Sequence, residues 1–474
     1  MKNQERNRGP KTLRFGLAPL LLLTGLLASL SAQSSKPNEK KGDDANRENC
    51  GYPNYCARTD RKVEPYGQTP PALGRAGSVI TDPSFRSRIL RVTDEASDPG
   101  KPGMPFRTPS SAEQNSWNRN GTLFYVLNGG GRILLYGFDP SSFRATQLKL
   151  PEFRWRGEPQ FSYSNDDLLY GVSNKSPSFQ KYEVSKDKLS TIHDPATCLK
   201  LDSTAYGADI SVSADDQRFM MVIGPKQDAN NIVYVYNVQK GCRWYNTQSG
   251  EISGKWGPTG KATLAESYLI HNARMSKSGK YIYVTGTGGA SGIWDVDTSS
   301  VIPCRANPQQ QCGGHRALGY SHLINPSLRV HAMNLLKRPL GKTEEFSPLV
   351  PDLQAKQGWF DQHLSWNNAD PDDTTPACFS TFHPTNPGTP GAPLTVNGPW
   401  ENEIDCIQMD GKGSKIWRFA HTYSTARNGF WSTPRGNVSP DGRFFMFTSD
   451  WQDQLGNDPR GKGYRTDVFI VELR

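Results

Sequence analysis

The clearest indication of the fold is the C-terminal stretch from His421 to Arg474, HTYSTARNGFWSTPRGNVSPDGRFFMFTSDWQDQLGNDPRGKGYRTDVFIVELR. It contains a tight turn at 439–442, a strand of alternating aromatic residues with Phe445 and Phe447, and a last strand from Asp467 to Leu473. This pattern is typical of one β-propeller blade that lacks its outermost strand.

The same signature, a short polar turn followed by an alternating apolar run, occurs at six more places. Their spacing of roughly 40 to 70 residues is that of propeller repeats with insertions. The six turns are 118–121, 164–167, 213–216, 276–279, 325–327 and 367–370. We therefore predict an all-β, seven-bladed β-propeller.

The strand that the last blade lacks must come from elsewhere in the chain. Residues 87–93 form an unassigned strand before the first full repeat, and pairing of Ile89–Thr93 with Asp467–Leu473 would close the ring. Closure removes exposed sheet edges. A β-sandwich is the alternative, but one orphan strand at each end of seven repeats favours the closed propeller.

Residues 1–32 have the basic start, apolar centre and small terminal residues of a cleaved signal peptide. A retained membrane anchor is the alternative, although Pro19 and Gly25 interrupt the apolar stretch. We expect a secreted or periplasmic protein with no stable membrane insertion after cleavage. Residues 33–77, charged and rich in Pro and Gly, are expected to form a flexible lead-in, and 78–474 the propeller domain.

The composition suits one large β domain, because 45 Gly and 35 Pro in 474 residues favour turns over helices. The net charge of +9 is not gathered into a Lys/Arg run, which argues against a nucleic-acid partner. We expect a monomer.

The eight cysteines of an exported chain predict local disulfides rather than unpaired buried thiols. The expected pairs are Cys50–Cys56, Cys198–Cys242, Cys304–Cys312 and Cys378–Cys406. Each is expected to staple a loop or insertion rather than the ring. No Cys-x-x-Cys pair occurs, so no metal site is predicted, and the cofactor is left open.

The candidate site follows from the position of the marker turns. The innermost strand of each blade precedes its turn, so residues a few positions earlier should lie at one mouth of the central channel. This ring consists of Gln114, Glu158, Asp209, His271, His315, His363 and Arg435. Tyr268, Arg274, Arg316 and Gln362 lie in the same segments. A mouth rich in Arg and His should attract anions, although any single histidine can instead have a structural role.

Two further features have both a functional and a structural interpretation. The Pro-rich and Gly-rich insertion 370–400 is not expected to pair as a strand; it is either a rim over the site or surface decoration. Four tryptophans are either platforms for sugar rings or packing between blades. They are Trp359, Trp400, Trp417 and Trp431.

Three segments carry a resemblance to a known family. AESYLIHNARMSKSGKYIYV (265–284), GHRALGYS (314–321) and SPDGRFFMFTSDW (439–451) resemble segments of the oligogalacturonate lyases, which are seven-bladed propellers. The resemblance implies that His271 is a general base and His315 a metal ligand. Where that family has a His-Pro-His stretch, this chain has Thr433-Pro434-Arg435, so two of the implied ligands are missing.

Three functions are compatible with the sequence. The first is binding of an anionic, uronate- or sulfate-bearing polysaccharide or oligosaccharide, with Arg435 pairing with an acidic group. The second is a polysaccharide lyase acting by β-elimination, with His271 as base and Arg274 stabilising the developing charge. The third is a non-catalytic protein-interaction scaffold. The ligand-binding residues expected are His315, His363, Arg435, Tyr268, Arg316 and Gln362.

Overall fold

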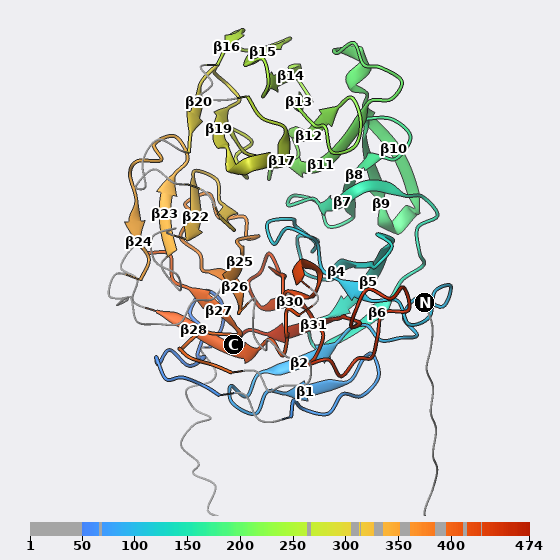
Figure 1. Cartoon of the computed structure of the whole chain (residues 1–474), viewed down its shortest axis with the longest axis vertical. Coiled ribbons are helices and arrows are strands. Elements are labelled where there is room, and N and C mark those ends of the chain that lie inside the picture. The colour runs from blue at the N-terminus through green and yellow to red at the C-terminus, as the bar shows by residue number, and fades with distance from the viewer. Residues whose placement is uncertain are drawn as a thin grey trace, which may run out of the picture. The chain divides into compact units, whose positions relative to one another are not determined.

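Seven antiparallel sheets lie around a common centre in the computed structural model (Figure 1). The predicted all-β, seven-bladed propeller is therefore confirmed. The structure describes residues 50–65, 69–262, 267–304, 312, 314–326, 335–350, 361–383, 395–410, 415–427 and 429–474. The predicted signal peptide and residues 33–49 of the lead-in lie outside these ranges.

Each blade is a sheet whose strands follow one another outward from the centre. Blades one and two are β3 (Phe106–Arg107), β4 (Leu123–Asn128), β5 (Ile133–Asp139) and β6 (Arg144–Gln147), then β7 (Trp155–Phe161), β8 (Leu168–Ser173), β9 (Phe179–Glu183) and β10 (Lys188–His193). Blade three has six strands, β11 (Tyr206–Val212), β12 (Arg218–Gly224), β13 (Ile232–Asn237), β14 (Gly241–Asn246), β15 (Glu251–Gly254) and β16 (Gly260–Lys261).

The remaining blades follow the same plan. Blades four and five are β17 (Ile270–Met275), β18 (Tyr281–Gly286), β19 (Ser291–Asp295) and β20 (Val301–Pro303), then β21 (Ala317–Leu318), β22 (His322–Pro326), β23 (Leu335–Pro339) and β24 (Ser347–Pro348). Blade six is β25 (Asp361–Ser365), β26 (Ala377–Phe382), β27 (Glu403–Ile407) and β28 (Ile416–His421). Blade seven is β29 (Gly436–Val438), β30 (Phe444–Ser449), β31 (Asp467–Glu472), β2 (Arg88–Arg91) and β1 (Val79–Thr81). The short 3-10 turns are η2 (Val184–Lys186), η3 (Pro195–Thr197), η4 (Thr287–Gly289) and η5 (Gly429–Ser432).

The ring closes as predicted, because β2 pairs antiparallel with β31 in blade seven. Leu90 lies opposite Ile470, and both side chains are fully buried. Arg91 adds an ion pair of 2.6 Å to Asp467 of the partner strand. The N-terminal segment also supplies a fifth strand, β1, outside β2. Both ends of the chain thus contribute to one sheet.

The repeated turn has a common physical basis, which is clearest in blade seven. The Ser439 hydroxyl donates to Asp441 at 2.6 Å and accepts the Phe444 amide at 3.1 Å. Gly442 has φ +69, in the left-handed region that favours glycine. Ser213 and Asp215 make the same side-chain bond, also at 2.6 Å, in blade three. The turn is therefore closed by its own side chains, which explains why it recurs in sequence.

One turn and one insertion differ from the prediction. Asn325 and Pro326 are the end of β22 rather than a turn before it, and residues 327–330 lie outside the described part. The insertion 370–400 does contain a strand, because β26 pairs with both β25 and β27. Its flanking Pro and Gly residues lie outside the paired segment, so they do not prevent pairing.

All four predicted disulfides are confirmed. The expectation that each staples a loop is wrong for Cys378–Cys406, because these residues are direct cross-strand neighbours in β26 and β27. This bond therefore lies within the body of blade six. In the described ranges, no helix is long and apolar enough to span a membrane.

Residues 50–65, part of the expected lead-in, pack against blades six and seven. The Tyr55 ring lies 5.2 Å from the Trp417 ring, and its hydroxyl donates to the Gly442 carbonyl at 2.6 Å. Arg58 forms a backbone bridge with Arg418 of β28. The contacts fix this segment along the outside of the last two blades.

Candidate functional site at one mouth of the channel

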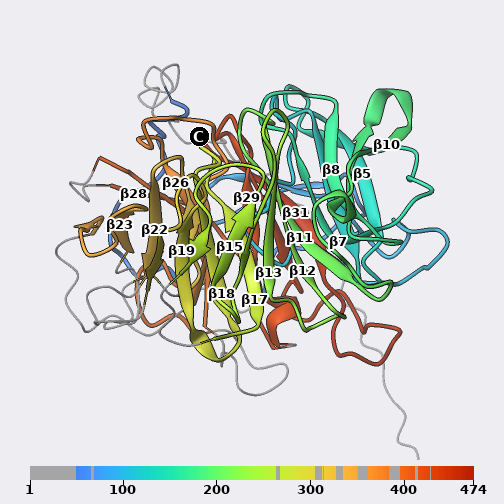
Figure 2. The same cartoon turned by 90° about the horizontal axis from the view of Figure 1, so that it is seen from above.

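Six of the predicted ring residues lie on or just before the innermost strands of their blades, whereas Gln114 follows the end of β3. We call the end of the ring at which the innermost strands begin the mouth face. Because each blade alternates strand direction, the connections β4–β5, β28–β29 and β30–β31 also emerge at this end. Figure 2 shows the η5 turn and the red β30–β31 loop on the same face of the ring. Loops of blades one, six and seven thus surround one side of the mouth.

Three consecutive inner strands, β7, β11 and β17, carry irregularities near their starts on the mouth face. The pairing register shifts between Arg156 and Gln160, between Ala208 and Ser211, and between Ile270 and Asn272. Bulges of this kind re-aim side chains and are frequent beside functional sites. They contain Glu158, Asp209 and His271, three members of the predicted ring.

The acidic members of the ring are paired with arginines. Arg107 donates to Glu158 at 2.6 Å, and the Ser110 amide and hydroxyl donate to the same carboxylate. Burial would raise the pKa of Glu158, but Arg107 and Ser110 outweigh it and lower that pKa. Glu158 is therefore ionised at neutral pH and neutralises much of the Arg107 charge.

Asp209 and Arg274 form a looser pair, with 3.8 Å between carboxylate and guanidinium. Burial raises the pKa of Asp209, whereas Arg274 and His271 act in the opposite direction. Arg274 is buried, but the His271 side chain is exposed on its bulge. Of the two predicted catalytic residues, only His271 is thus directly open to solvent.

His315 and His363 lie next to each other, with ring centroids 4.2 Å apart. His315 is half-exposed and bonds to Asp361 at 3.1 Å, whereas His363 is buried and contacts the Thr433 hydroxyl at 3.2 Å. Burial, together with His315 and Arg435, lowers the pKa of His363 well below its usual value. His363 is therefore neutral at physiological pH.

Arg435 is fully buried, contrary to the expectation that it faces a ligand. Its guanidinium lies 4.3 Å from the Phe430 ring and 5.3 Å from the Trp431 ring, and it donates to Thr433 and to the Trp431 carbonyl. Burial and the nearby Arg107 lower its pKa to about 9, so the charge persists at neutral pH. In this arrangement Arg435 supports the η5 aromatics and does not contact solvent.

The other three predicted ligand-binding residues are also largely covered by protein. Arg316 is buried, with its guanidinium 3.6 Å from the Tyr283 ring centroid. Gln362 is buried beside His363, and its side-chain oxygen accepts no hydrogen bond from a residue that the structure describes. Tyr268 packs against the core that blades three and four share. These residues shape the wall of the mouth rather than its open surface.

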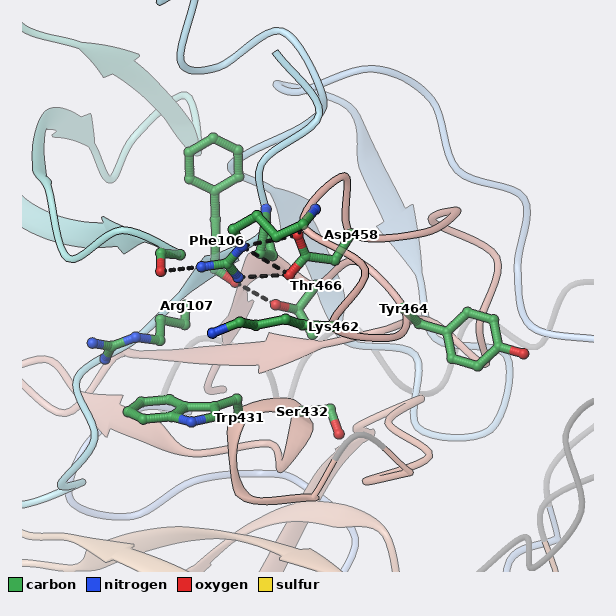
Figure 3. A pocket seen from close by; sticks show the side chains of 11 residues that line it. Phe106, Arg107, Trp431, Ser432, Asp458, Lys462, Tyr464 and Thr466 are labelled. Carbon is green, nitrogen blue, oxygen red and sulfur yellow. Dashed lines mark hydrogen bonds and ion pairs between the residues drawn. The ribbon is translucent and has the colours of Figure 1, made fainter. Parts of the chain in front are cut away.

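Two cavities open on the mouth face, and Arg107 lines both. The first, of about 380 Å³, lies over the β7 and β11 bulges and includes Arg154, Glu158, Asp209 and Arg274. The second, of about 270 Å³, lies between β3, η5 and the β30–β31 loop (Figure 3). The walls of the second cavity include Trp431, Asp458, Arg460 and Lys462.

Most residues of the second cavity were not found from the sequence. Its walls come from segments near 105, 431 and 460, which are far apart in the chain. The only local signal is NDPRGKGYR (457–465), a turn-rich segment with three cations. Trp431 alone was a candidate, as a sugar platform. Trp400 and Trp417 are core residues, and Trp359 lies outside the described residues.

The two loops that form the second cavity are tied to each other. Asp450, at the start of the β30–β31 loop, accepts hydrogen bonds from the Thr425 amide, at 2.9 Å, and from the Thr425 hydroxyl. Arg427 forms an ion pair with Asp453. Both contacts join the segment before η5 to the β30–β31 loop. They should therefore hold the cavity in shape.

Asp450 predicts a pH dependence of stability. Burial raises its pKa to about 7, above the value of about 3.9 in an unfolded chain. The contribution of Asp450 to the free energy of unfolding is present at low pH and is lost as the pH rises through about 7. Between the unfolded and folded pKa values this loss is about 1.4 kcal/mol per pH unit. We expect the free energy of unfolding in urea to differ less between about pH 4.5 and about pH 7.5 in Asp450→Asn than in the wild type. Asp139→Asn, in an exposed turn, serves as control; an unchanged difference in Asp450→Asn would contradict the assignment.

The mouth does not fit the divalent cation that the family resemblance implies. Within the described ranges, no three His, Cys, Asp or Glu side chains are grouped as metal ligands. Arg435, at the position of one missing histidine, places a positive charge that acts on His363. A cation at this point would be repelled by the guanidinium. We therefore derive no chemistry through a metal.

The fold and the site define a β-propeller with a basic, partly aromatic mouth face. No family model matches the chain, and no curated protein is similar to it in sequence. A solved oligogalacturonate lyase in complex with manganese is 11% identical, with a TM-score of 0.55 over 86% of this chain and 98% of that chain.

Two further solved structures are more distant in shape. An oligogalacturonate lyase from Vibrio parahaemolyticus is 9% identical, with a TM-score of 0.45 over 86% of this chain and 99% of that chain. A chain of a mitotic checkpoint complex is 11% identical, with a TM-score of 0.45 over 96% of this chain and 99% of that chain. The likeness to oligogalacturonate lyase-like propellers rests on the structure with the TM-score of 0.55 and is a likeness of fold.

Proposed function

We propose that this protein binds an acidic oligosaccharide or polysaccharide across its mouth face. The main support is a pair of cavities that share Arg107 in their walls. Arg154 is an exposed residue of the first cavity and Lys462 an exposed residue of the second, and neither forms an ion pair with a described residue. Uncommitted cations beside a cavity favour an anionic ligand.

Carbohydrate is favoured over other anions by the aromatic wall of the second cavity. Trp431 is 53% exposed, although large apolar side chains are usually buried. Tryptophan combines a large apolar surface with an N–H donor, which suits the apolar face and hydroxyl groups of a sugar ring. The shared fold with an oligogalacturonate lyase supports the same ligand class. We include export in the proposal, because four disulfides are typical of oxidising compartments.

The binding experiment compares two exposed arginines on opposite faces of the ring. Arg154→Gln removes a cation at the mouth, whereas Arg119→Gln removes one in the turn 118–121 at the other end. We expect Arg154→Gln to weaken binding of a uronate-bearing oligosaccharide by about 1.5 kcal/mol, the low end for hydrogen bonds to charged groups. The control should bind like the wild type. Equal affinities for all three proteins would place the ligand elsewhere.

A lyase is the second candidate, favoured by the exposure of His271. Its imidazole makes no hydrogen bond to a described residue and lies close enough to Asp209 to oppose the rise that burial causes in the pKa of that carboxyl. An open imidazole beside a carboxylate is suited to proton abstraction. Incubation with uronate polymers, monitored by the absorbance of unsaturated uronate, tests this reaction. Turnover that disappears in His271→Ala while binding persists would establish it; absence of turnover in the wild type leaves binding as the function.

A further inference from the structure

The second cavity is more than an extension of the mouth, because it contains a cation presented by its own turn. We propose that this cavity is a subsite for one acidic sugar residue, whose carboxylate or sulfate lies on Lys462 and whose ring packs against Trp431. This proposal rests on the proposed function and assigns the residues that select an acidic unit over a neutral one. Figure 3 shows Lys462 extending across the cavity above Trp431.

The charges in the cavity are committed to protein partners, with one exception. Arg460 makes two short contacts to Asp458, at 2.6 and 2.9 Å, and also donates to the Gly129 carbonyl. Arg107 donates to Glu158 at 2.6 Å. Lys462 forms no hydrogen bond or ion pair with any residue that the structure describes, although its charge contributes to lowering the pKa of Asp458, which Arg460 contacts directly. One acidic group of a ligand therefore has one cation without a direct protein contact to meet.

The backbone around Lys462 is built to present it. Asp458 accepts from the Arg460 amide at 2.9 Å, its own amide donates to the Gly463 carbonyl at 2.7 Å, and the Gly461 amide donates back to Asp458 at 2.9 Å. Gly461 and Gly463 have φ of +71 and +90, in the left-handed region that side chains disfavour. The result is a closed turn with Lys462 between two glycines at its tip.

Trp431 completes the subsite on the opposite wall. The Arg107 guanidinium lies 4.6 Å from its ring centroid, and the buried Arg435 lies at 5.3 Å. These two cations hold the indole in place while about half of it stays exposed. Its N–H makes no hydrogen bond to a described residue, so it is available to a sugar hydroxyl.

Lysine provides a compact charge without the planar fork of arginine, so it accepts a carboxylate or a sulfate equally. Three probe oligosaccharides distinguish these two acidic groups by calorimetric titration. They are a hyaluronan oligosaccharide, with carboxylates only, a κ-carrageenan oligosaccharide, with sulfates only, and neutral maltohexaose. The full-length protein is compared with Lys462→Gln and with Lys240→Gln. Lys240 also lies near a tryptophan, 5.7 Å from the Trp256 ring centroid, at the β13–β14 turn on the opposite face, and serves as the matched control.

We expect Lys462→Gln to weaken binding of the acidic probe about tenfold, the scale of one hydrogen bond to a charged group, with Lys240→Gln unchanged. Trp431→Leu should lose affinity, and Trp431→Phe should recover part of it because an aromatic wall remains. Failure of both acidic probes to bind the wild type would overturn the proposed function and this subsite together. Binding of an acidic probe with equal affinity to wild type and Lys462→Gln would overturn the subsite alone.

Discussion

A chain that starts at residue 95, and so lacks β1 and β2, is expected to lose cooperative unfolding. In the intact protein, β2 covers the edge of β31, and Ile89 and Leu90 are fully buried. Their removal exposes an apolar sheet edge and deletes two side chains that each contribute about 1.5 to 3 kcal/mol by burial. The Arg91–Asp467 ion pair would also be lost, leaving Asp467 buried beside only Arg465.

Urea unfolding monitored by near-ultraviolet circular dichroism tests this expectation. A chain that starts at residue 70 is the control, because it keeps β1 and β2 but lacks the segment 50–65. We expect it to unfold cooperatively, with reduced stability from the loss of Tyr55 and its contacts. A chain from residue 95 that unfolds at the same urea concentration as the control would show that strand closure is not required.

The second large effect is expected at Arg418, a fully buried residue of β28. Its guanidinium forms two short contacts with Glu403, at 2.6 and 2.7 Å, and acts on Asp405. The carboxylate oxygens of Asp405 accept no hydrogen bond within the described part of the chain. Burial raises the pKa of both carboxyls, with Glu403 adding to the effect on Asp405. Arg418→Met would leave two buried acids without their cation, at a cost of about 3 to 5 kcal/mol.

The measurement is the free energy of unfolding at neutral pH, with variants that separate lost charge from lost packing. Adding Glu403→Gln and Asp405→Asn to Arg418→Met should restore most of the stability, because all three buried positions are then uncharged. Arg443→Met serves as the control, since its pair with Asp441 is half-exposed and such pairs contribute little. Equal, small losses for Arg418→Met and Arg443→Met would contradict this assignment.

The fold could be predicted from the sequence because its repeating signal is local. The turn around Ser439 is closed by side chains only two to five residues apart, so every complete copy leaves a visible pattern. Strand closure also followed, since a single unpaired strand remained at each end. Strand β26 was missed because its apolar segment is short and lies among Pro and Gly residues, whose frequency hid the pairing.

The offsets before each turn indicated which inner strands carry the ring residues, but not how exposed their side chains are. Glu158, Asp209 and His271 lie on the inner strands β7, β11 and β17. The offsets gave no information on η5. This turn covers Arg435, so the side chain that was expected to contact a ligand supports Trp431 instead. Lys462 was missed for a related reason, because its cavity exists only once three distant segments are folded together.

We propose that the mouth face binds an acidic carbohydrate through its charge. The most direct measurement is calorimetric titration of the wild-type protein with a uronate oligosaccharide and with the same oligosaccharide after reduction of its carboxyl groups to alcohols. We expect the acidic form to bind, more weakly as salt is raised because exposed charges are screened, and the reduced form to bind at least tenfold more weakly, the scale of one charged hydrogen bond. Equal affinity for the two forms, or binding of neither, would contradict the claim.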